Sequence, residues 1–386
     1  MRRIKALFLY VSFSSGHQRA AEAIMEAFGR RYPEVQTKGV NSFSYAHPGA
    51  ERFVGRTYLE MLKRTPQLWG YLYDNKNVAD ATSEIRGLLG RLNLKKYTKL
   101  ITGYSPDVVV CTQAAPCAAI SNLKEKGHRS LRLVAVITDF KAHSYWLCEH
   151  VDIYIVPTFE VMADLMRKGV GRNKIHVLGI PIDPKFNVAQ GKAKARHGLG
   201  MDPDLKTILV MGGGQGFGPM EDILKELSMV NEPFQAIVIT GRNKKLYRKL
   251  KKTQDRLPYP VRVMGFTRHV EKVMDASDLI ITKPGGMTSS EALAKGLPII
   301  IVDPIPGQEE RNSQFLVHEK VALRIDDIRR LHNLVSDLLS NDERLHRMKR
   351  RAFDVSRPNA AINSVEAIMD LVDYASVRDA VASLNT

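Results

Sequence analysis

The chain has 386 residues, of which 44% are hydrophobic, and this is enough to fill about two domain cores, so extensive disorder is excluded. Its 57 Lys and Arg residues outnumber 41 Asp and Glu, and the net charge of +16 favours an anionic partner: an acidic lipid surface, nucleic acid or a phosphorylated substrate. The apolar runs fall far short of the roughly 20 residues that a membrane-spanning helix needs.

Cysteine usage indicates a reducing compartment. Cys111, Cys117 and Cys148 are odd in number and lack C-x-x-C spacing. We interpret them as reduced core residues of a cytoplasmic protein.

Apolar runs bounded by turns alternate with stretches of helical period along the chain, from "IKALFLYVSF" to "LPIIIVD". Continuous apolar strands separated by helices are typical of parallel sheets covered on both faces. We predict an α/β fold of two doubly wound, Rossmann-like domains facing a cleft. A segment rich in Pro and Gly, "GIPIDPKFNVAQGKAKARHGLGMDPDLK", marks the boundary between a domain of residues 1–190 and one of residues 200–360. Residues 361–386 are expected to form a helical tail that packs back on the first domain.

The first loop, "SFSSGHQRAAEAIMEAF", places Gly16 in a turn and His17 at the start of a helix. A histidine at that position, near the carboxyl end of the first strand, is suited to act as a general base. The alternative is a histidine that only caps the helix.

Residues 51–100 hold ten basic and five acidic residues among aromatic and aliphatic ones, including Trp69 and Tyr71. Such a surface fits an interfacial contact with an anionic membrane. A solvated helix face over a core stripe is the alternative.

The segment "ILVMGGGQGFGPMEDILKEL" predicts a strand, a glycine loop and a helix. Gly213, Gly214 and Gly216 let backbone N–H groups approach an anion, which favours phosphate binding. The spacing matches neither the dinucleotide motif nor the P-loop. A tight turn that only packs helix on strand is the alternative.

Two loops near the next strands, in "TKPGGMTSSEALAKGLPIIIVDPIPGQEERN", complete a ligand site. The first offers Lys283, Gly286 and Thr288, with Glu291 in the first turn of the following helix, either accepting ribose hydroxyls or completing a capping box. The second is a loop that presents Gln308, Glu309 and Asn312, groups that bind sugar hydroxyls. Together they predict a nucleotide sugar as ligand.

These motifs, with "TDFKAHSYW", "GIPID" and "GFTRHVEKVMDASDLI", resemble the diacylglycerol glycosyltransferases over nearly the whole chain. The resemblance implies a B-type glycosyltransferase fold, inversion at the anomeric carbon, a UDP-hexose donor bound by the C-terminal domain and a diacylglycerol acceptor bound by the N-terminal domain. It also implies that no metal or other cofactor is needed.

Site residues follow from the resemblance position by position. On the donor side it implies Gly213 and Gly214 at the diphosphate, Phe266 beside the uracil, Thr288 at a phosphate, Glu291 at the ribose, and Gln308, Glu309 and Asn312 at the hexose. On the acceptor side it implies His17 as the essential histidine and adds Asp139 and His143 as catalytic candidates, in a segment that also holds Trp146. Asp139 either orients a base or only caps a strand end. Asp202 and Asp204 imitate a D-x-D metal motif but lie before a strand, so we predict no metal site there.

The leading hypothesis is transfer of glucose or galactose from its UDP ester to diacylglycerol by a peripheral enzyme on the cytoplasmic face of the cell membrane. The alternative is a GlcNAc transferase like the one that acts on undecaprenyl-pyrophosphate-muramoyl-peptide in peptidoglycan synthesis. A UDP-sugar epimerase shares the architecture but leaves residues 51–100 unexplained. A nucleic-acid-binding module, suggested by eight Lys and Arg residues within 241–256, lacks a recognised motif, so we expect no nucleic-acid partner.

Overall fold

A computed structural model describes residues 3–12, 15–49 and 94–384. The predicted membrane segment, residues 51–100, therefore lies outside the described residues except for residues 94–100. The chain divides into two compact units, residues 1–184 with 357–386 and residues 185–356.

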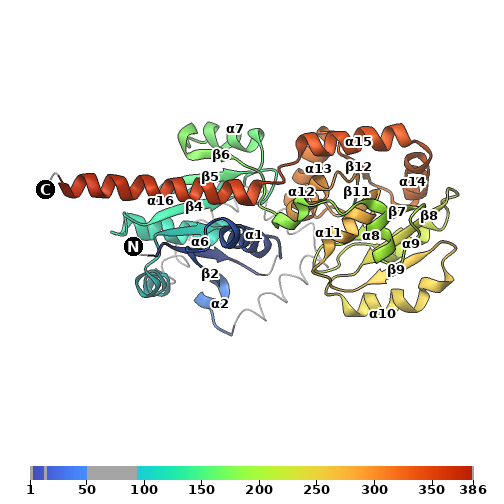
Figure 1. Ribbon diagram of the computed structural model, residues 1–386, viewed down its shortest axis with the longest axis horizontal. Coiled ribbons are helices and arrows are strands. Elements are labelled where there is room, and N and C mark those ends of the chain that lie inside the picture. The colour runs from blue at the N-terminus through green and yellow to red at the C-terminus, as the bar shows by residue number, and fades with distance from the viewer. Residues whose placement is uncertain (1–2, 13–14, 50–93, 385–386) are drawn as a thin grey trace. The chain divides into compact units, whose positions relative to one another are not determined.

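The first unit is built on a parallel six-stranded sheet with the order β2-β1-β3-β4-β5-β6 (Figure 1). Its strands are β1 (Lys5–Tyr10), β2 (Gln36–Asn41), β3 (Val108–Cys111), β4 (Arg132–Val136), β5 (Ile153–Val156) and β6 (Ile175–Val177). The helices that carry or flank the predicted residues are α1 (Ser15–Arg31), α2 (Ser42–Ala46), α6 (Ala114–Glu125), the short 3-10 turn η1 (Ser144–Trp146) and α7 (Phe159–Arg167).

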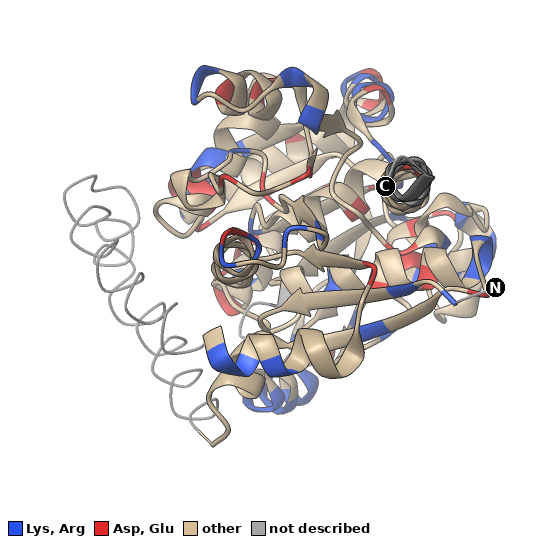
Figure 2. Ribbon diagram, turned by 90° about the vertical axis from the view of Figure 1, so that its left-hand side faces the viewer, with Lys and Arg blue, Asp and Glu red and all other residues tan. Residues whose placement is uncertain are grey.

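Side chains alternate between the two faces of this sheet. Leu7 and Val109 belong to a core shared with α6, whereas Phe8 and Val110 pack with α1 and the C-terminal helix. Both faces are therefore covered, which explains why the strands are continuous apolar runs. Figure 2 shows Lys, Arg, Asp and Glu placed mainly on helices and loops, with the strands largely free of them.

The second unit repeats this plan with the strand order β12-β11-β10-β7-β8-β9, again all parallel. The strands are β7 (Lys206–Met211), β8 (Phe234–Ile239), β9 (Val261–Met264), β10 (Leu279–Thr282), β11 (Ile299–Val302) and β12 (Ala322–Ile325). The helices are α8 (Lys192–Gly198), α9 (Met220–Leu227), α10 (Lys244–Thr253), α11 (Val270–Ala276), α12 (Gly286–Ala294), α13 (Gln308–His318), α14 (Leu331–Ser340) and α15 (Asp342–Val355). Two doubly wound, Rossmann-like units confirm the predicted fold class.

The C-terminal helix α16 (Ala360–Leu384) follows the second unit in sequence but belongs to the first. It packs on α1, where Glu366 accepts hydrogen bonds from Arg31 Nε at 2.9 Å and from the Tyr32 hydroxyl at 2.6 Å. The predicted start of this tail at residue 361 is close to the point where the chain re-enters the first unit, residue 357.

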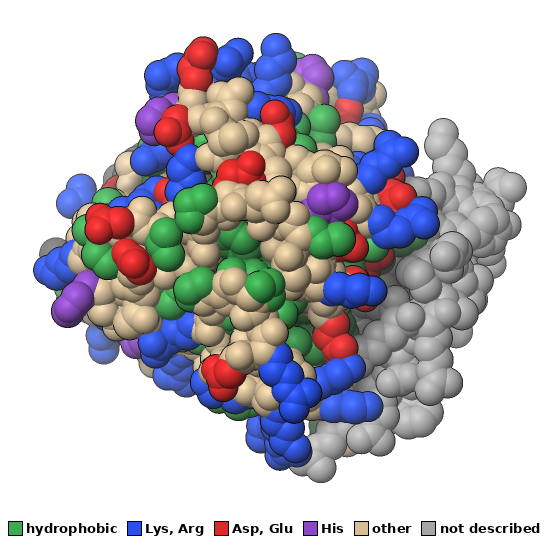
Figure 3. All heavy atoms as spheres, turned by 90° about the vertical axis from the view of Figure 1, so that its right-hand side faces the viewer, with side chains coloured by type: hydrophobic (Ala, Val, Ile, Leu, Met, Phe, Trp, Pro, Cys, Tyr) green, Lys and Arg blue, Asp and Glu red, His purple; other side chains and the backbone are tan. Residues whose placement is uncertain are grey.

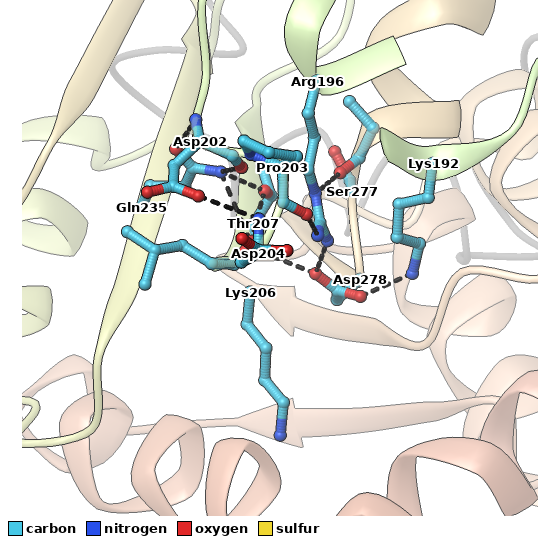
Figure 4. A network of polar contacts seen from close by, with 12 residues as sticks. Lys192, Arg196, Asp202, Pro203, Asp204, Lys206, Thr207, Gln235, Ser277 and Asp278 are labelled. Carbon is cyan, nitrogen blue, oxygen red and sulfur yellow. Dashed lines mark hydrogen bonds and ion pairs between the residues drawn. The ribbon is translucent and has the colours of Figure 1, made fainter. Parts of the chain in front are cut away.

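The chain passes from the first unit to the second between Pro184 and Lys185, within the segment that was expected to mark a boundary. From Lys185 onward this segment belongs to the second unit, and α8 within it packs on α11. Figure 4 shows how it is held: Asp278 forms ion pairs with Arg196 and Lys192 and accepts the backbone N–H of Thr207. Here Asp202 accepts the backbone N–H of Asp204 at 2.8 Å. The D-x-D string therefore closes a turn before β7.

Three aspartates share a role at the amino ends of strands. Asp107, Asp152 and Asp278 each precede a strand, and their carboxylates accept the backbone N–H of Lys5, Leu133 and Thr207 on the neighbouring strand. Each carboxylate thus accepts, at the start of a strand, a backbone N–H that has no partner in the hydrogen-bond ladder of the sheet. These residues lie at the edge opposite to the loops that carry the predicted site.

Candidate active site

His17 is the centre of a cluster at the carboxyl ends of three strands in the first unit. It follows β1, Thr112 follows β3 and Thr138 follows β4, and parallel strands bring these ends to one edge. The Thr138 hydroxyl lies 2.9 Å from His17 Nδ1, and the Thr112 hydroxyl donates to the His17 carbonyl at 2.8 Å. Both the ring and the backbone of His17 are therefore fixed.

Burial lowers the pKa of His17 below its ordinary value of 6.5, while the Asp139 carboxylate and a hydrogen bond between the His17 ring and the Thr112 backbone oppose this effect. At neutral pH the ring is therefore uncharged and has a basic nitrogen. A contact between Nδ1 and Thr138 leaves Nε2 as the atom that can accept a proton, provided that Nδ1 carries the hydrogen.

The segment that contains Asp139, His143 and Trp146 runs from β4 into η1. Asp139 lies within electrostatic reach of His17. His143 caps η1: its Nδ1 accepts the Tyr145 N–H at 3.2 Å, and its ring lies 3.7 Å from that of Tyr145. Trp146 is buried in the core beside α6. Asp139 therefore interacts electrostatically with His17. His143 contacts its own turn, and Trp146 packs in the core.

In the second unit, the glycine loop after β7 is packed so tightly that side chains are excluded. A Cβ on Gly212 would lie 1.7 Å from the Phe217 carbonyl oxygen, and one on Gly216 would lie 1.9 Å from that of Thr240. Gly213 and Gly216 have φ of 65° and 67°, which favours glycine. The loop is therefore a tight turn and also a candidate anion-binding site, so both the packing role and the phosphate-binding role remain compatible with its structure.

Gly286 begins α12 after a short loop that follows β10, and no side chain of the described residues caps this helix. Its first N–H groups are thus available to an anion, and Thr288 lies in the same turn. The prediction for Glu291 was wrong in one respect. Glu291 is the sixth residue of α12 and lies in its second turn, too far along for a capping box, and it is 8% exposed.

Gln308, Glu309 and Asn312 were predicted to lie in a loop, but they lie in α13, which begins at Gln308. Gly307, with φ of 91°, makes the sharp entry into the helix. Gln308 and Glu309 are at the helix start, where N–H groups also point outward, and Asn312 is buried one turn later.

Lys283 and Glu309 connect the two loops. Lys283 Nζ lies 3.4 Å from Glu309 Oε2, which also accepts the Ile305 N–H at 2.8 Å. Burial raises the pKa of Glu309, and the ammonium of Lys283 opposes that rise. The Lys283 stem also lies beside the glycine loop, since a Cβ on Gly218 would meet its Cδ at 3.8 Å. One cation therefore adjoins three of the predicted donor segments.

Phe266 follows β9 and is 50% exposed. The guanidinium of Arg242 lies over its ring, 5.2 Å from the centroid. Sequence reasoning missed Arg242, which it counted within a basic run, and Thr138, which it read only as the end of a strand. The local signals "TGRN" and "VITDF" were present, but their relation to Phe266 and His17 depends on strand order.

The predicted donor residues, together with Arg242, form a row along one edge of the sheet. In the order of the strands they are the α13 start after β11, Lys283 and α12 after β10, the glycine loop after β7, Arg242 after β8 and Phe266 after β9. From β11 to β9 there are four spacings of about 4.8 Å, or roughly 19 Å in all. Such a row fits an elongated ligand with an anionic middle.

Within the described residues, no group of three or more His, Cys, Asp or Glu side chains is arranged to hold a metal ion. None of the helices in the described part of the chain is long and apolar enough to cross a membrane. Cys111, Cys117 and Cys148 are free thiols, the first two of them buried.

Comparison with known proteins places both units in glycosyltransferase families. Residues 17–182 match the model of monogalactosyldiacylglycerol (MGDG) synthase, and residues 207–367 match that of the glycosyltransferase family 28 C-terminal domain. A probable chloroplastic monogalactosyldiacylglycerol synthase of Glycine max is 31% identical over 95% of this chain and 71% of its own. A processive diacylglycerol beta-glucosyltransferase of Bacillus pumilus is 26% identical over 96% and 95%.

Solved structures share the fold. MurG of Acinetobacter baumannii superposes with a TM-score of 0.65 at 15% identity, over 95% of this chain and 99% of its own. HepE of Anabaena in complex with UDP gives a TM-score of 0.59 at 15% identity, over 96% and 100%. These similarities confirm the B-type glycosyltransferase fold. The relatives in sequence decide the family: this chain is a glycosyltransferase that belongs to the diacylglycerol glycosyltransferase family, together with the monogalactosyldiacylglycerol synthases and the processive diacylglycerol β-glucosyltransferases.

Proposed function

We propose that the protein is an inverting glycosyltransferase that moves a hexose from UDP-glucose or UDP-galactose to the free hydroxyl of 1,2-diacylglycerol, forming a membrane glycolipid. The observation that carries this proposal is the row of donor residues along the edge of the second sheet. Its order, with hydroxyl-binding groups at α13, anion-binding groups in the middle and an exposed aromatic ring at Phe266, parallels hexose, diphosphate and base. Kinship to diacylglycerol enzymes over 95% of the chain supports the acceptor.

In this proposal His17 is the general base of the reaction. Nε2 takes the proton of the diacylglycerol hydroxyl as its oxygen forms a bond to the anomeric carbon. The bond from that carbon to the β-phosphate oxygen breaks on the opposite face, so the configuration inverts and UDP leaves with the electron pair. Thr138 fixes the ring, and Asp139 favours the imidazolium that forms.

Charge that develops on the departing UDP meets fixed donors in the second unit. The glycine loop at Gly213 and Gly214 and the start of α12 at Gly286 and Thr288 offer backbone N–H groups, and Lys283 supplies a cation. Gly216 instead closes the loop, because its N–H donates to the Gly213 carbonyl at 3.1 Å. Hydrogen-bond donors that are already oriented stabilise such charge without having to reorganise. We infer that this electrostatic stabilisation of the leaving group is the largest contribution to catalysis. Glu291 binds the ribose, and Gln308, Glu309 and Asn312 bind the hexose.

The first unit, predicted from the sequence as residues 1–190, is then the acceptor domain, and the second, predicted as residues 200–360, is the donor domain. The acceptor resides in a bilayer, so we also propose that the enzyme binds the cytoplasmic face of the membrane through anionic phospholipids and the basic, aromatic segment 51–100. No nucleic acid, metal ion or other cofactor takes part in this proposal.

The test is incubation of the purified protein with each radiolabelled UDP-hexose and diacylglycerol in mixed micelles that contain phosphatidylglycerol, followed by chromatography of the lipids. Labelled hexosyl-diacylglycerol, formed equally well in the presence of EDTA, is the expected product. Label that enters lipid only from UDP-GlcNAc and an undecaprenyl-pyrophosphate acceptor would replace the proposal with the peptidoglycan enzyme. No labelled lipid from any donor would contradict both.

A further inference from the structure

Arg242 touches two parts of the proposed donor site at once. Its backbone N–H donates to the Gly214 carbonyl of the glycine loop at 3.0 Å. Its guanidinium lies 5.2 Å from the centroid of the Phe266 ring. Because β8 lies between β7 and β9, the segment that follows β8 adjoins the loops after both neighbours.

The backbone of this segment, residues 240–243, is held on both sides. Toward the glycine loop, a Cβ on Gly241 would lie 2.5 Å from the Gly214 oxygen, and Asn243 Nδ2 donates to the Gly216 carbonyl at 3.3 Å. Toward β9, the Thr240 N–H donates to the Met264 carbonyl at 3.0 Å. The Cα of Arg242 is therefore fixed, although its side chain is exposed.

Phe266 is the opposite case. Half of its surface is exposed, and the guanidinium of Arg242 lies over its ring. A planar guanidinium stacks on an aromatic face in a way that an ammonium does not. The ring that is proposed to border the base is thus in contact with a residue whose backbone is bound to the proposed diphosphate loop.

We propose that Arg242 is a positioning residue for the donor nucleotide: it holds the Phe266 ring where the uracil of UDP lies and fixes that ring relative to the diphosphate loop. This inference rests on the proposed function and deepens it. It also gives Arg242 a role that differs from those of the other basic residues of 241–256. Figure 3 shows Lys and Arg side chains gathered toward the bottom of the face that it draws, the level at which Figure 1 labels α10.

The experiment measures binding of UDP by calorimetry, and of uridine and inorganic pyrophosphate by competition, to the wild-type protein and four variants. The variants are Arg242→Ala, Arg242→Lys, Phe266→Leu and the double variant Arg242→Ala with Phe266→Leu. Arg248→Ala is the matched control, because Arg248 is an exposed arginine of the same basic segment and its loss changes the net charge equally.

If Arg242 acts through Phe266, Arg242→Ala weakens UDP and uridine by about 3- to 10-fold, the usual scale of a cation–π contact, and leaves pyrophosphate unchanged. The double variant is then no weaker than Phe266→Leu alone, because interacting residues give non-additive effects. Arg242→Lys keeps part of the affinity, and Arg248→Ala keeps all of it.

Additive losses in the double variant would show that Arg242 does not act through Phe266 and would overturn the inference. So would a loss confined to pyrophosphate, or an equal loss in Arg248→Ala, since each points to charge alone. A wild-type protein that binds no UDP would overturn the donor part of the proposed function together with the inference. Wild-type affinity for UDP that survives unchanged in Arg242→Ala would overturn the inference alone.

Discussion

Glu291 lies in the second turn of α12, close to the uncapped start of that helix, and is 8% exposed. If it accepts the ribose hydroxyls, Glu291→Ala lowers UDP affinity by roughly 1.5 to 3 kcal/mol, the size of a hydrogen bond to a charged group. Calorimetry on the folded variant checks this. Glu310→Ala serves as the control, because it removes a carboxylate of α13 that is paired with Arg324 of β12. Unchanged affinity in Glu291→Ala would exclude Glu291 from the donor site.

His17 has its ring set by Thr138 and its backbone by Thr112, which suits a base more than a helix cap. His17→Ala is expected to lower turnover by about 100-fold or more while UDP affinity stays nearly intact. Steady-state kinetics beside UDP calorimetry separate the two quantities. A parallel collapse of UDP affinity would make His17 a donor-binding or structural residue.

The pKa of His17 gives a pH dependence with a definite sign. Burial lowers this pKa below 6.5, so the active, neutral form persists into mildly acidic solution, and the acid limb of kcat/KM lies below pH 6.5. Asp139 raises the pKa, so Asp139→Asn moves the limb to still lower pH. A profile of kcat/KM against pH checks both shifts. An Asp139→Asn limb that moves upward would contradict this electrostatic role.

At the scale of elements, the amino and carboxyl ends of the strands in each sheet have different roles. The carboxyl ends carry glycine turns, helix starts and the polar groups of the site, whereas the amino ends are closed by Asp107, Asp152 and Asp278. A ligand at one edge therefore does not have to compete with the contacts that fasten the strands at the other.

Asp278 tests this division, because it joins α8 to the amino ends of β7 and β10. Asp278→Ala leaves Arg196, a buried cation, without its carboxylate and costs roughly 3 to 5 kcal/mol of unfolding free energy in the second unit. Asp278→Asn, which keeps an oxygen for the Thr207 N–H, costs less. Urea unfolding measures both, with the exposed Asp255→Ala as control. Native UDP affinity in folded Asp278→Asn is expected; its loss would show that the two edges are coupled.

At the scale of the whole molecule, the net charge of +16 and the absence of a spanning helix among the described residues frame the question of how a lipid acceptor is reached. The basic residues of segment 51–93 lie outside the described structure, so their role stays a prediction. Those of α10 are described and exposed, which makes them a matched comparison.

Liposome flotation decides which basic segment meets the membrane. We expect the variant with Arg52→Glu, Arg56→Glu, Lys63→Glu and Arg64→Glu to float poorly on vesicles with phosphatidylglycerol, since each cation near such a surface contributes about 1 kcal/mol. The control carries Lys244→Glu, Lys245→Glu, Arg248→Glu and Lys252→Glu. Binding of the native protein should weaken with salt. Equal flotation of both variants and the native protein would leave segment 51–100 as a solvated helix face.

The sequence by itself was sufficient for the fold class and the family. Buried parallel strands can be predicted from local sequence, because they are continuous apolar runs such as "VDIYIV". Glycines in tight turns can be predicted as well, because other residues do not fit the left-handed backbone there. The positions of His17 near the helix start after β1 and of Gly213 in the turn after β7 followed from motifs of this kind, whereas Glu291 lies one turn later in α12 than the sequence suggested. The start of α13 did not, because Gly307 turns the chain into a helix at Gln308 where the sequence suggested a loop.

Only the tertiary structure decided which of these residues meet. Thr138 reaches His17 because β4 lies close to β1 in the sheet, with only β3 between them. Arg242 reaches Phe266 because β8 lies next to β9. The return of α16 to the first unit likewise depends on contacts with α1 more than 300 residues away in sequence. Strand order and helix docking are set by long-range packing of apolar faces, and a local pattern fixes which face is apolar but not which neighbour covers it.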